Sequence, residues 1–188
     1  MAVRPVRIYG DPALREKARP VAAFDDSLRA LVADLFETMK AYNGIGLAAN
    51  QVGVVQRVFV VDVPAGDDPP VRFAAVNPVL ERRAGRHRAE EGCLSMPGIY
   101  EDVVRAGHLV LRARDEHGRE FERALEGFAA RAVQHEADHL DGVLFTDRLS
   151  PLKRQFLRRA LEALARGELP EGYHPGEGTR AGGGERAI

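Results

Sequence analysis

The sequence is poor in cysteine: Cys93 is the one cysteine among 188 residues. A single cysteine cannot form an internal disulfide, which excludes the disulfide-stabilised domains of small secreted proteins and favours a reducing compartment. Long hydrophobic runs are also missing, since no stretch approaches the roughly 20 apolar residues that a membrane-spanning helix needs. Residues Met1–Arg7 lack the continuous apolar core of a secretory signal. We therefore expect a cytoplasmic protein.

An excess of one charge sign is absent as well. The chain has 27 Lys and Arg residues against 28 Asp and Glu residues, which gives a formal net charge of −1. A nearly neutral protein has no bulk attraction for nucleic acid or for a membrane, although local patches can exist. We expect no membrane association and no specific DNA binding.

Length and composition predict one ordinary globular domain. Hydrophobic residues make up 45% of the chain and charged residues 29%. A chain of this size can bury about 70% of its unfolded surface in one core. Residues 168–188 are rich in Gly, Pro and Glu, so we assign the domain to residues 1–167 and predict a disordered tail over 168–188.

Hydrophobic periodicity predicts helices separated by several strands. Helices are expected at 25–41, at 127–141 and from Ser150-Pro151 to Gly167, the last with an apolar stripe of Leu152, Phe156, Ala160, Leu161 and Leu164. Strands are expected at 56–63, 73–80 and in a hairpin of 107–114 with 119–125, and a loop at Pro64–Pro70. The expected fold is α+β, in which a central metal-binding helix packs against small antiparallel or mixed sheets, with an N-terminal and a C-terminal helix.

The pentapeptide His135-Glu136-Ala137-Asp138-His139 has the spacing of a metal site on a helix. Residues four apart lie on one helix face, so His135 and His139 can hold one transition-metal ion. Glu136 lies beside that face, where it can take a proton from a water on the metal. The alternative is a surface helix with scattered polar residues. The apolar segment 127–134 argues against it, because buried His and Glu need partners.

Two histidines leave the metal short of protein ligands. Zinc metalloproteases with this pentapeptide use a downstream Glu or His, but here only His174 in the predicted tail and Glu162 on a separate helix follow. Upstream, Cys93 lies in the segment 91–95, EGCLS, where glycine lets the backbone approach an ion. Cys93 could instead be a small buried hydrophobe. The glycines and proline around it favour a turn, and a Cys-His-His set leaves one position open for water, as in catalytic sites.

The segment 44–51, GIGLAANQ, matches a variant of the dinucleotide-binding glycine motif. That motif must follow a strand and open a helix, whereas this segment follows a helix and leads into a strand, so we reject the match. A tight turn is compatible with function, because glycines let a substrate backbone come close. Gln51 could donate its amide to a developing oxyanion.

In their order and spacing, the segments 44–51, 91–95 and 134–139 resemble the motifs of the peptide deformylase family, and the resemblance spans about residues 3–166. It implies a metal-dependent hydrolase that removes the N-formyl group from formyl-methionine at the start of newly made polypeptides, releasing formate. It also implies one divalent metal ion, natively Fe²⁺ and replaceable by Zn²⁺, Ni²⁺ or Co²⁺. Cys93, His135 and His139 would be its ligands.

The resemblance assigns further roles. Glu136 would act as general base and then as proton donor to the leaving amine. The Gln51 side chain and the Leu94 N–H would stabilise the oxyanion. Ile45, Gly46 and Glu91 would bind the substrate peptide in an extended form.

Three further residues each allow two interpretations. Arg131 lies one turn before His135, where some members of the family have an aliphatic residue that lines the methionine pocket; alternatively, its guanidinium reaches solvent. Arg105 and Asp138 could form a pair that orients the metal-binding helix, or a plain surface ion pair.

The motifs disfavour two other functions. A small peptidase is disfavoured by the upstream cysteine, and a non-catalytic metal-binding or ribosome-binding relative is disfavoured because binding a metal needs neither Glu136 nor Gln51. The expected partners are formyl-methionyl nascent polypeptides. The last helix could also touch ribosomal RNA, or simply be a solvated face, through its basic residues Lys153, Arg154, Arg158, Arg159 and Arg166.

Overall fold

The computed structural model describes residues 2–65, 68–171 and 173. Three α-helices and seven strands follow one another along these residues, with three short 3-10 helices between them. Their bounds are 3-10 helix Pro12–Leu14, α1 Asp26–Ala41, β1 Gly46–Ala48, 3-10 helix Ala49–Val52, β2 Val58–Ala65, β3 Asp68–Ala84, β4 His87–Cys93, β5 Met96–Arg105, β6 His108–Arg114, β7 Glu120–Glu126, α2 Gly127–Leu140, 3-10 helix Phe145–Arg148 and α3 Pro151–Ala165.

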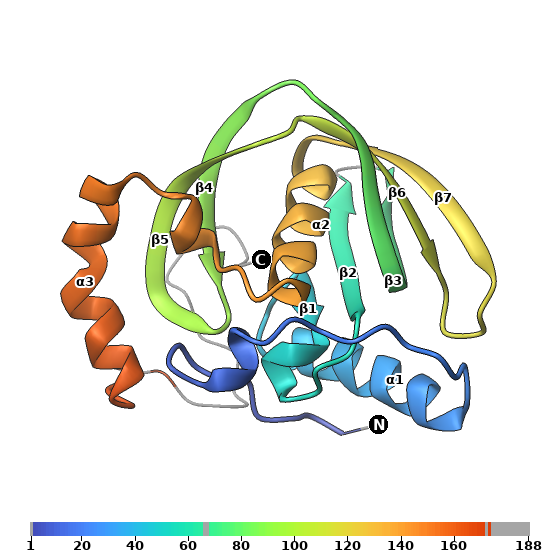
Figure 1. The fold of residues 1–188 in the computed structure, drawn as a ribbon, viewed down its shortest axis with the longest axis horizontal. Helices are drawn as coiled ribbons and strands as arrows, with labels where there is room; N and C mark the ends of the chain where they lie inside the picture. Colours follow the sequence, from blue (N-terminus) through green and yellow to red (C-terminus); the bar gives the residue numbers. More distant parts are fainter. Residues whose placement is uncertain (1, 66–67, 172, 174–188) are drawn as a thin grey trace.

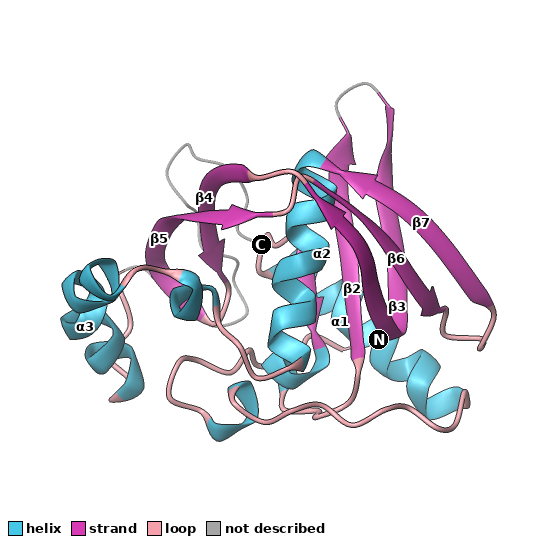
Figure 2. Cartoon of the chain, turned by 45° about the horizontal axis from the view of Figure 1, so that its top comes forward, coloured by secondary structure: helices cyan, strands magenta, loops and turns pink. Residues whose placement is uncertain are grey.

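The strands form two antiparallel sheets. The larger sheet has the order β1-β2-β3-β6-β7, and the smaller one pairs β4 with β5. Helix α2 lies between the two sheets, while α1 lies against the larger sheet and α3 outside β5 (Figures 1 and 2). The predicted α+β fold with a central helix is confirmed.

Helix α2 is buried on more than one face, and this determines the site. Its small apolar residues Ala130, Ala132 and Val133 pack with the strands of the larger sheet. Small side chains let the helix lie close to both neighbours. The polar residues on its other face therefore lie at the interface with β4 and β5, away from bulk solvent. A buried polar group needs a partner or an ion, so α2 brings functional chemistry into the interior.

Helix α1 begins and ends as predicted. The Asp25 carboxylate accepts hydrogen bonds from the N–H groups of Ser27 and Leu28, which satisfies two donors of the first turn. Asn43 has a φ of 55°, a left-handed conformation that terminates the helix. The Asn43-Gly44 segment then turns the chain into β1, so the end of α1 fixes the start of the glycine-rich segment.

Several sequence-based expectations need correction. The strands β4 and β5 were not predicted, and the loop expected at Pro64–Pro70 is largely strand, because β2 extends to Ala65 and β3 begins at Asp68. In α3 the residues Leu161 and Leu164 are buried, but Leu152 and Phe156 of the predicted stripe are 62% and 76% exposed. No element among the described residues covers these two side chains.

Most of the predicted tail, 168–188, lies outside the described residues, which include 168–171 and 173. Its described part includes Tyr173, which is buried in the apolar cluster beside α1. None of the described helices combines the length and apolarity that crossing a bilayer requires.

Candidate metal centre and active site

Three potential metal ligands from distant parts of the sequence meet beside α2. Cys93 ends β4, and His135 and His139 are one turn apart on α2. The Cys93 Sγ lies 3.3 Å from His139 Nε2, which lies 3.2 Å from His135 Nε2. All three donor atoms lie within 4.8 Å of one another, and all three residues are buried. The structure therefore brings together the three residues that the sequence predicted as ligands.

These separations suit one transition-metal ion. Tetrahedral bonds of about 2.0–2.1 Å to nitrogen and about 2.3 Å to sulfur place the donor atoms about 3.3–3.6 Å apart. Imidazole and thiolate together suit ions such as zinc and iron rather than magnesium or calcium. With three protein donors, a fourth position stays available for water or substrate, as in catalytic sites.

The electrostatics of the donors also favour a cation. Burial raises the pKa of the Cys93 thiol to about 12, even though Ser95 opposes the shift by hydrogen bonding to the sulfur through its N–H and hydroxyl. A neighbouring cation would stabilise the thiolate that this environment otherwise disfavours. Burial lowers the pKa of His139 well below its usual value and keeps the ring neutral, which is the form that binds metal.

Glu136 is fully buried, and neither of its carboxylate oxygens has a hydrogen-bond partner among the described residues. Burial raises the pKa of this carboxyl well above its usual value. Leaving such a group unpaired costs about 1–3 kcal/mol, so an unpaired buried acid marks a functional site more often than a structural one. Glu136 lies against Gly46, where a Cβ would come within 2.9 Å of the carboxyl carbon. Glycine at position 46 therefore makes room for the acid.

Gln51 directs its amide toward the donor cluster. Its Oε1 accepts a hydrogen bond of 2.8 Å from the Ala48 N–H, which fixes the orientation of the amide group. Its Nε2 consequently faces the Cys93 Sγ at 3.6 Å and the Ser95 Oγ at 3.2 Å. The predicted oxyanion donor thus lies beside the predicted ligands. Leu94 follows Cys93 directly, in the turn between β4 and β5, and is buried.

The carboxylate of Glu91 supports His135, a role that the sequence did not reveal. Glu91 Oε2 lies 3.0 Å from His135 Nδ1, which orients the ring so that Nε2 faces the cluster. Arg105 donates to both oxygens of Glu91, at 2.6 and 2.8 Å, and Arg131 donates to Oε1. Burial disfavours the ionised form, but hydrogen bonds from His135 and Arg105 outweigh it and hold the pKa of Glu91 well below its usual value.

Arg131 and the Arg105–Asp138 pair belong to the same buried network. Arg131 is 1% exposed and also donates to the carbonyl groups of His87, Ala89 and Val103. The alternative in which Arg131 reaches solvent is therefore wrong. Arg105 donates to Asp138 at 2.8 Å with its own side chain 2% exposed, so the pair is a buried one.

The glycine-rich segment is tied to the metal-binding helix. Asn50 donates its side-chain amide to the carbonyl of His139. The carbonyl of Ile45 accepts a hydrogen bond of 2.8 Å from the N–H of Asp62 in β2. Among the described strands β1 pairs with β2 alone, so no described strand occupies its other edge. Ile45 and Gly46 thus stand at an open strand edge next to Glu136.

A cation at the three donors would activate water, and a carboxylate at Glu136 would be placed to take up its proton, so fold and site together fit a metallohydrolase. The family model for polypeptide deformylases matches residues 3–155 of this chain. The chain belongs to the polypeptide deformylase family.

Individual relatives support this family assignment. The peptide deformylase of Alkalilimnicola ehrlichii is 51% identical over 166 residues, covering 88% of this chain and 93% of the relative. That of Acidobacterium capsulatum is 46% identical and covers 88% of this chain and 98% of the relative. The crystal structure of a peptide deformylase from Legionella pneumophila aligns with a TM-score of 0.81 at 43% identity, over 90% of this chain and all of that one. The predicted family, fold and deformylase activity are confirmed, and a metal ion is supported.

Proposed function

We propose that this enzyme removes the N-formyl group from formyl-methionine at the start of nascent polypeptides, with one divalent cation held by Cys93, His135 and His139. The observation that carries the proposal is the convergence of these three donors beside the unpaired acid Glu136. The reaction consumes one water and yields formate and a free amino terminus.

When bound, the cation supplies Lewis acidity to the attacking water and to the formyl oxygen. Glu136 accepts the proton that the water loses as its oxygen attacks the formyl carbon. The same carboxyl then gives that proton to the leaving amine as the C–N bond breaks. The Gln51 amide and the Leu94 N–H donate to the oxygen that becomes negative. Removing the Gln51 donor should raise the barrier by about 2.7–4 kcal/mol, the typical value for an oxyanion donor.

The substrate peptide would lie between two open strand edges. β1 is an edge strand of the larger sheet, and β4 pairs with β5 on one side only. A peptide in extended form can add to such an edge through main-chain hydrogen bonds. The backbones of Gly46 and Glu91 would provide these bonds. Ile45, whose carbonyl accepts from the Asp62 N–H, would contact the substrate beside Gly46.

We propose Fe²⁺ as the native ion, with Zn²⁺, Ni²⁺ or Co²⁺ as possible substitutes. One sulfur and two imidazole nitrogens suit all four ions, so the donor set supports this group of metals rather than one member. Because nascent chains carry formyl-methionine where they are made, we also propose a cytoplasmic location.

A transient ribosome contact through α3 is a separate proposal. Of the five basic residues in α3 and at its C-cap, Arg154 and Arg159 are exposed and form no ion pair among the described residues. The other three pair with acids: Lys153 with Glu101, Arg158 with Glu162 and Arg166 with Glu168. Pairing reduces the charge available to RNA, so the support from α3 is limited to two arginines.

The decisive experiment measures formate release from a formyl-Met peptide by protein purified without oxygen, with metal analysis of the same sample. We expect near-stoichiometric metal, loss of activity on chelation and recovery on adding Fe²⁺. The Cys93→Ser variant should bind metal more weakly or prefer another ion. Full activity in demonstrably metal-free protein would overturn the proposal, and unchanged metal content in Cys93→Ser would remove that residue from the ligand set.

A further inference from the structure

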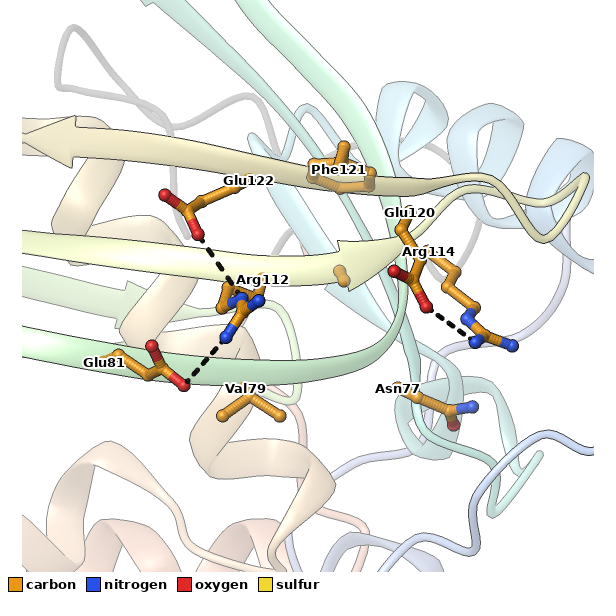
Figure 3. Close-up of a pocket in the computed structure, with 9 residues that line it drawn as sticks. Asn77, Val79, Glu81, Arg112, Arg114, Glu120, Phe121 and Glu122 are labelled. Carbon is orange, nitrogen blue, oxygen red and sulfur yellow. Dashed lines mark hydrogen bonds and ion pairs between the residues drawn. The ribbon is translucent and has the colours of Figure 1, made fainter.

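Two surface pockets outside the metal site differ in how their charges are balanced. The larger one, about 470 Å³, lies on β3, β6 and β7 (Figure 3). Its arginines are neutralised within the pocket: Arg112 pairs with Glu81 and Glu122, and Arg114 pairs with Glu120. Acids outnumber bases there, and each base has a partner. This pocket has no charge that calls for an ionic ligand.

The second pocket has the opposite balance. Its volume is about 330 Å³, and it is lined by four arginines but only one acid, Asp138. The negative charge of Asp138 is already paired with two arginines. Arg148 donates to both of its oxygens, and Arg105 donates to Oδ2. Arg83 and Arg86 form no ion pair with any acid among the described residues. The pocket therefore has a net positive charge without a counterion from the protein.

The two unpaired arginines belong to a basic segment, here called the basic turn, that includes the end of β3, residues 85–86 and the start of β4. Residues 82–88, RRAGRHR, contain four arginines and one histidine, and every one of these residues is exposed. The pairing of β3 with β6 shifts register between Glu81 and Ala84, and Arg82 there has a φ of 48°. Such a bulge changes the direction of neighbouring side chains. The fold thus presents arginines at the turn, beside the pocket, although the whole chain is nearly neutral.

We propose that this pocket and the basic turn bind phosphate groups, either of a small phosphate anion or of an RNA strand. Guanidinium groups match the geometry of phosphate oxygens and stay charged at any physiological pH. Arg83 and Arg86 would make the contacts, with Arg148 at the pocket wall. Arg82 extends the charge beyond the pocket, so that a second phosphate of a strand could be held. The proposal needs neither the metal ion nor the deformylase chemistry.

The test compares two double charge reversals of equal charge change, Arg83→Glu with Arg86→Glu and, as the matched control, Lys17→Glu with Arg19→Glu on the exposed segment before α1. Binding to a fluorescein-labelled 12-nucleotide RNA is measured by anisotropy over a range of salt concentrations. Each lost phosphate contact should lower the slope of log K against log salt by about 0.7. We expect about tenfold weaker binding or more for the turn variant and a much smaller change for the control variant.

Pyrophosphate competition distinguishes the two sources of phosphate. Displacement of RNA at comparable phosphate concentration would assign the pocket to a small anion, and resistance to displacement would assign it to a strand; either result supports the proposal if the turn variant binds poorly. Equal RNA binding by wild type and turn variant, equal losses in both variants, or no binding by wild type would overturn it. Unchanged deformylase activity confirms that the variants fold, and Arg83→Gln with Arg86→Gln provides a milder alternative.

Discussion

Glu91 and Glu136 are both fully buried and both lie next to His135, yet their surroundings are opposite. Glu91 accepts hydrogen bonds from Arg105 and Arg131 and contacts the His135 ring, while Glu136 has no hydrogen-bond partner among the described residues. The pKa of Glu91 is held low by its partners, and that of Glu136 is raised by burial. The same residue type thus serves two purposes, one as a fixed charge and the other as a group that can exchange a proton.

This difference shows which charges the fold needs. Two buried guanidinium groups depend on Glu91, because a buried cation without its partner is strongly destabilising. No hydrogen bond or ion pair among the described residues involves the Glu136 carboxyl, so burying it costs stability, which fits the catalytic role that we propose. We expect substitutions on the Glu91 side to act first on stability and metal binding. Substitutions on the Glu136 side should act on the chemical step alone.

The largest effect is expected for Glu136→Gln. The amide keeps the size of the side chain but cannot accept and return a proton, so kcat/KM for a formyl-Met peptide should fall by about 10²–10⁴. Metal content and thermal stability should not decrease, because no hydrogen bond is lost. Peptide kinetics, metal analysis and a melting curve on the same preparation check all three. A variant with wild-type activity would remove Glu136 from the mechanism.

The Glu91→Gln variant should show the reverse pattern. Loss of the negative charge leaves Arg131 buried without a counterion and Arg105 with Asp138 alone, which should lower the unfolding free energy by about 3–5 kcal/mol. His135 also loses its orienting partner, so metal affinity should fall by about 10–100-fold. Denaturant unfolding and metal titration measure the two effects. Glu90→Gln, at an exposed neighbouring position, is the matched control and should change neither. Equal stability of the two variants would contradict the comparison.

The sequence predicted those site residues whose spacing along the chain is itself informative. His135, Glu136 and His139 lie within five residues, so helix geometry alone places them together. Cys93 followed from the shortage of other ligands, and Gln51 from its glycine-rich neighbourhood. The proposed ligands, the acid Glu136 and the amide of Gln51 could therefore be predicted from the sequence alone. Their convergence is now seen, and their roles stay predictions.

The supporting network could not be read in the same way. Glu91, Arg105 and Arg131 come from β4, β5 and α2, and only the tertiary fold brings them together. The strand β4 itself was missed because its buried residues, Glu91–Cys93, are consecutive rather than alternating, which removes the period of two that marks a strand. The predicted burial of Leu152 and Phe156 was wrong for the opposite reason. Their spacing is correct for a buried stripe, but no element of the described structure covers them.

Gly46→Ala tests whether the Glu136 side depends on open space. The added methyl group would come within 2.9 Å of the Glu136 carboxyl carbon, so the acid must move. Overpacking of this kind costs about 1–3 kcal/mol, and we expect kcat/KM to fall by about 10–100-fold with metal content unchanged. Gly44→Ala is the control for crowding alone, since its methyl would meet the flexible side chain of Leu94. If Gly44→Ala lowers kcat/KM as much as Gly46→Ala does, contact with Glu136 is not the cause.

The smallest effect is expected at the outer end of the Glu91 network. Asp138→Asn keeps the shape of the side chain but weakens its ion pairs with Arg105 and Arg148, which should cost about 1 kcal/mol of stability. Arg105 keeps both hydrogen bonds to Glu91, so His135 should stay oriented and metal affinity should change little. Asp141→Asn provides the comparison, because its pair with Arg57 is half exposed and contributes less. A loss of metal affinity as large as that of Glu91→Gln would show that the network transmits disorder from the surface to the ligand. In that case the division between an anchoring side and a reactive side would have to be drawn at Asp138 rather than at Glu91.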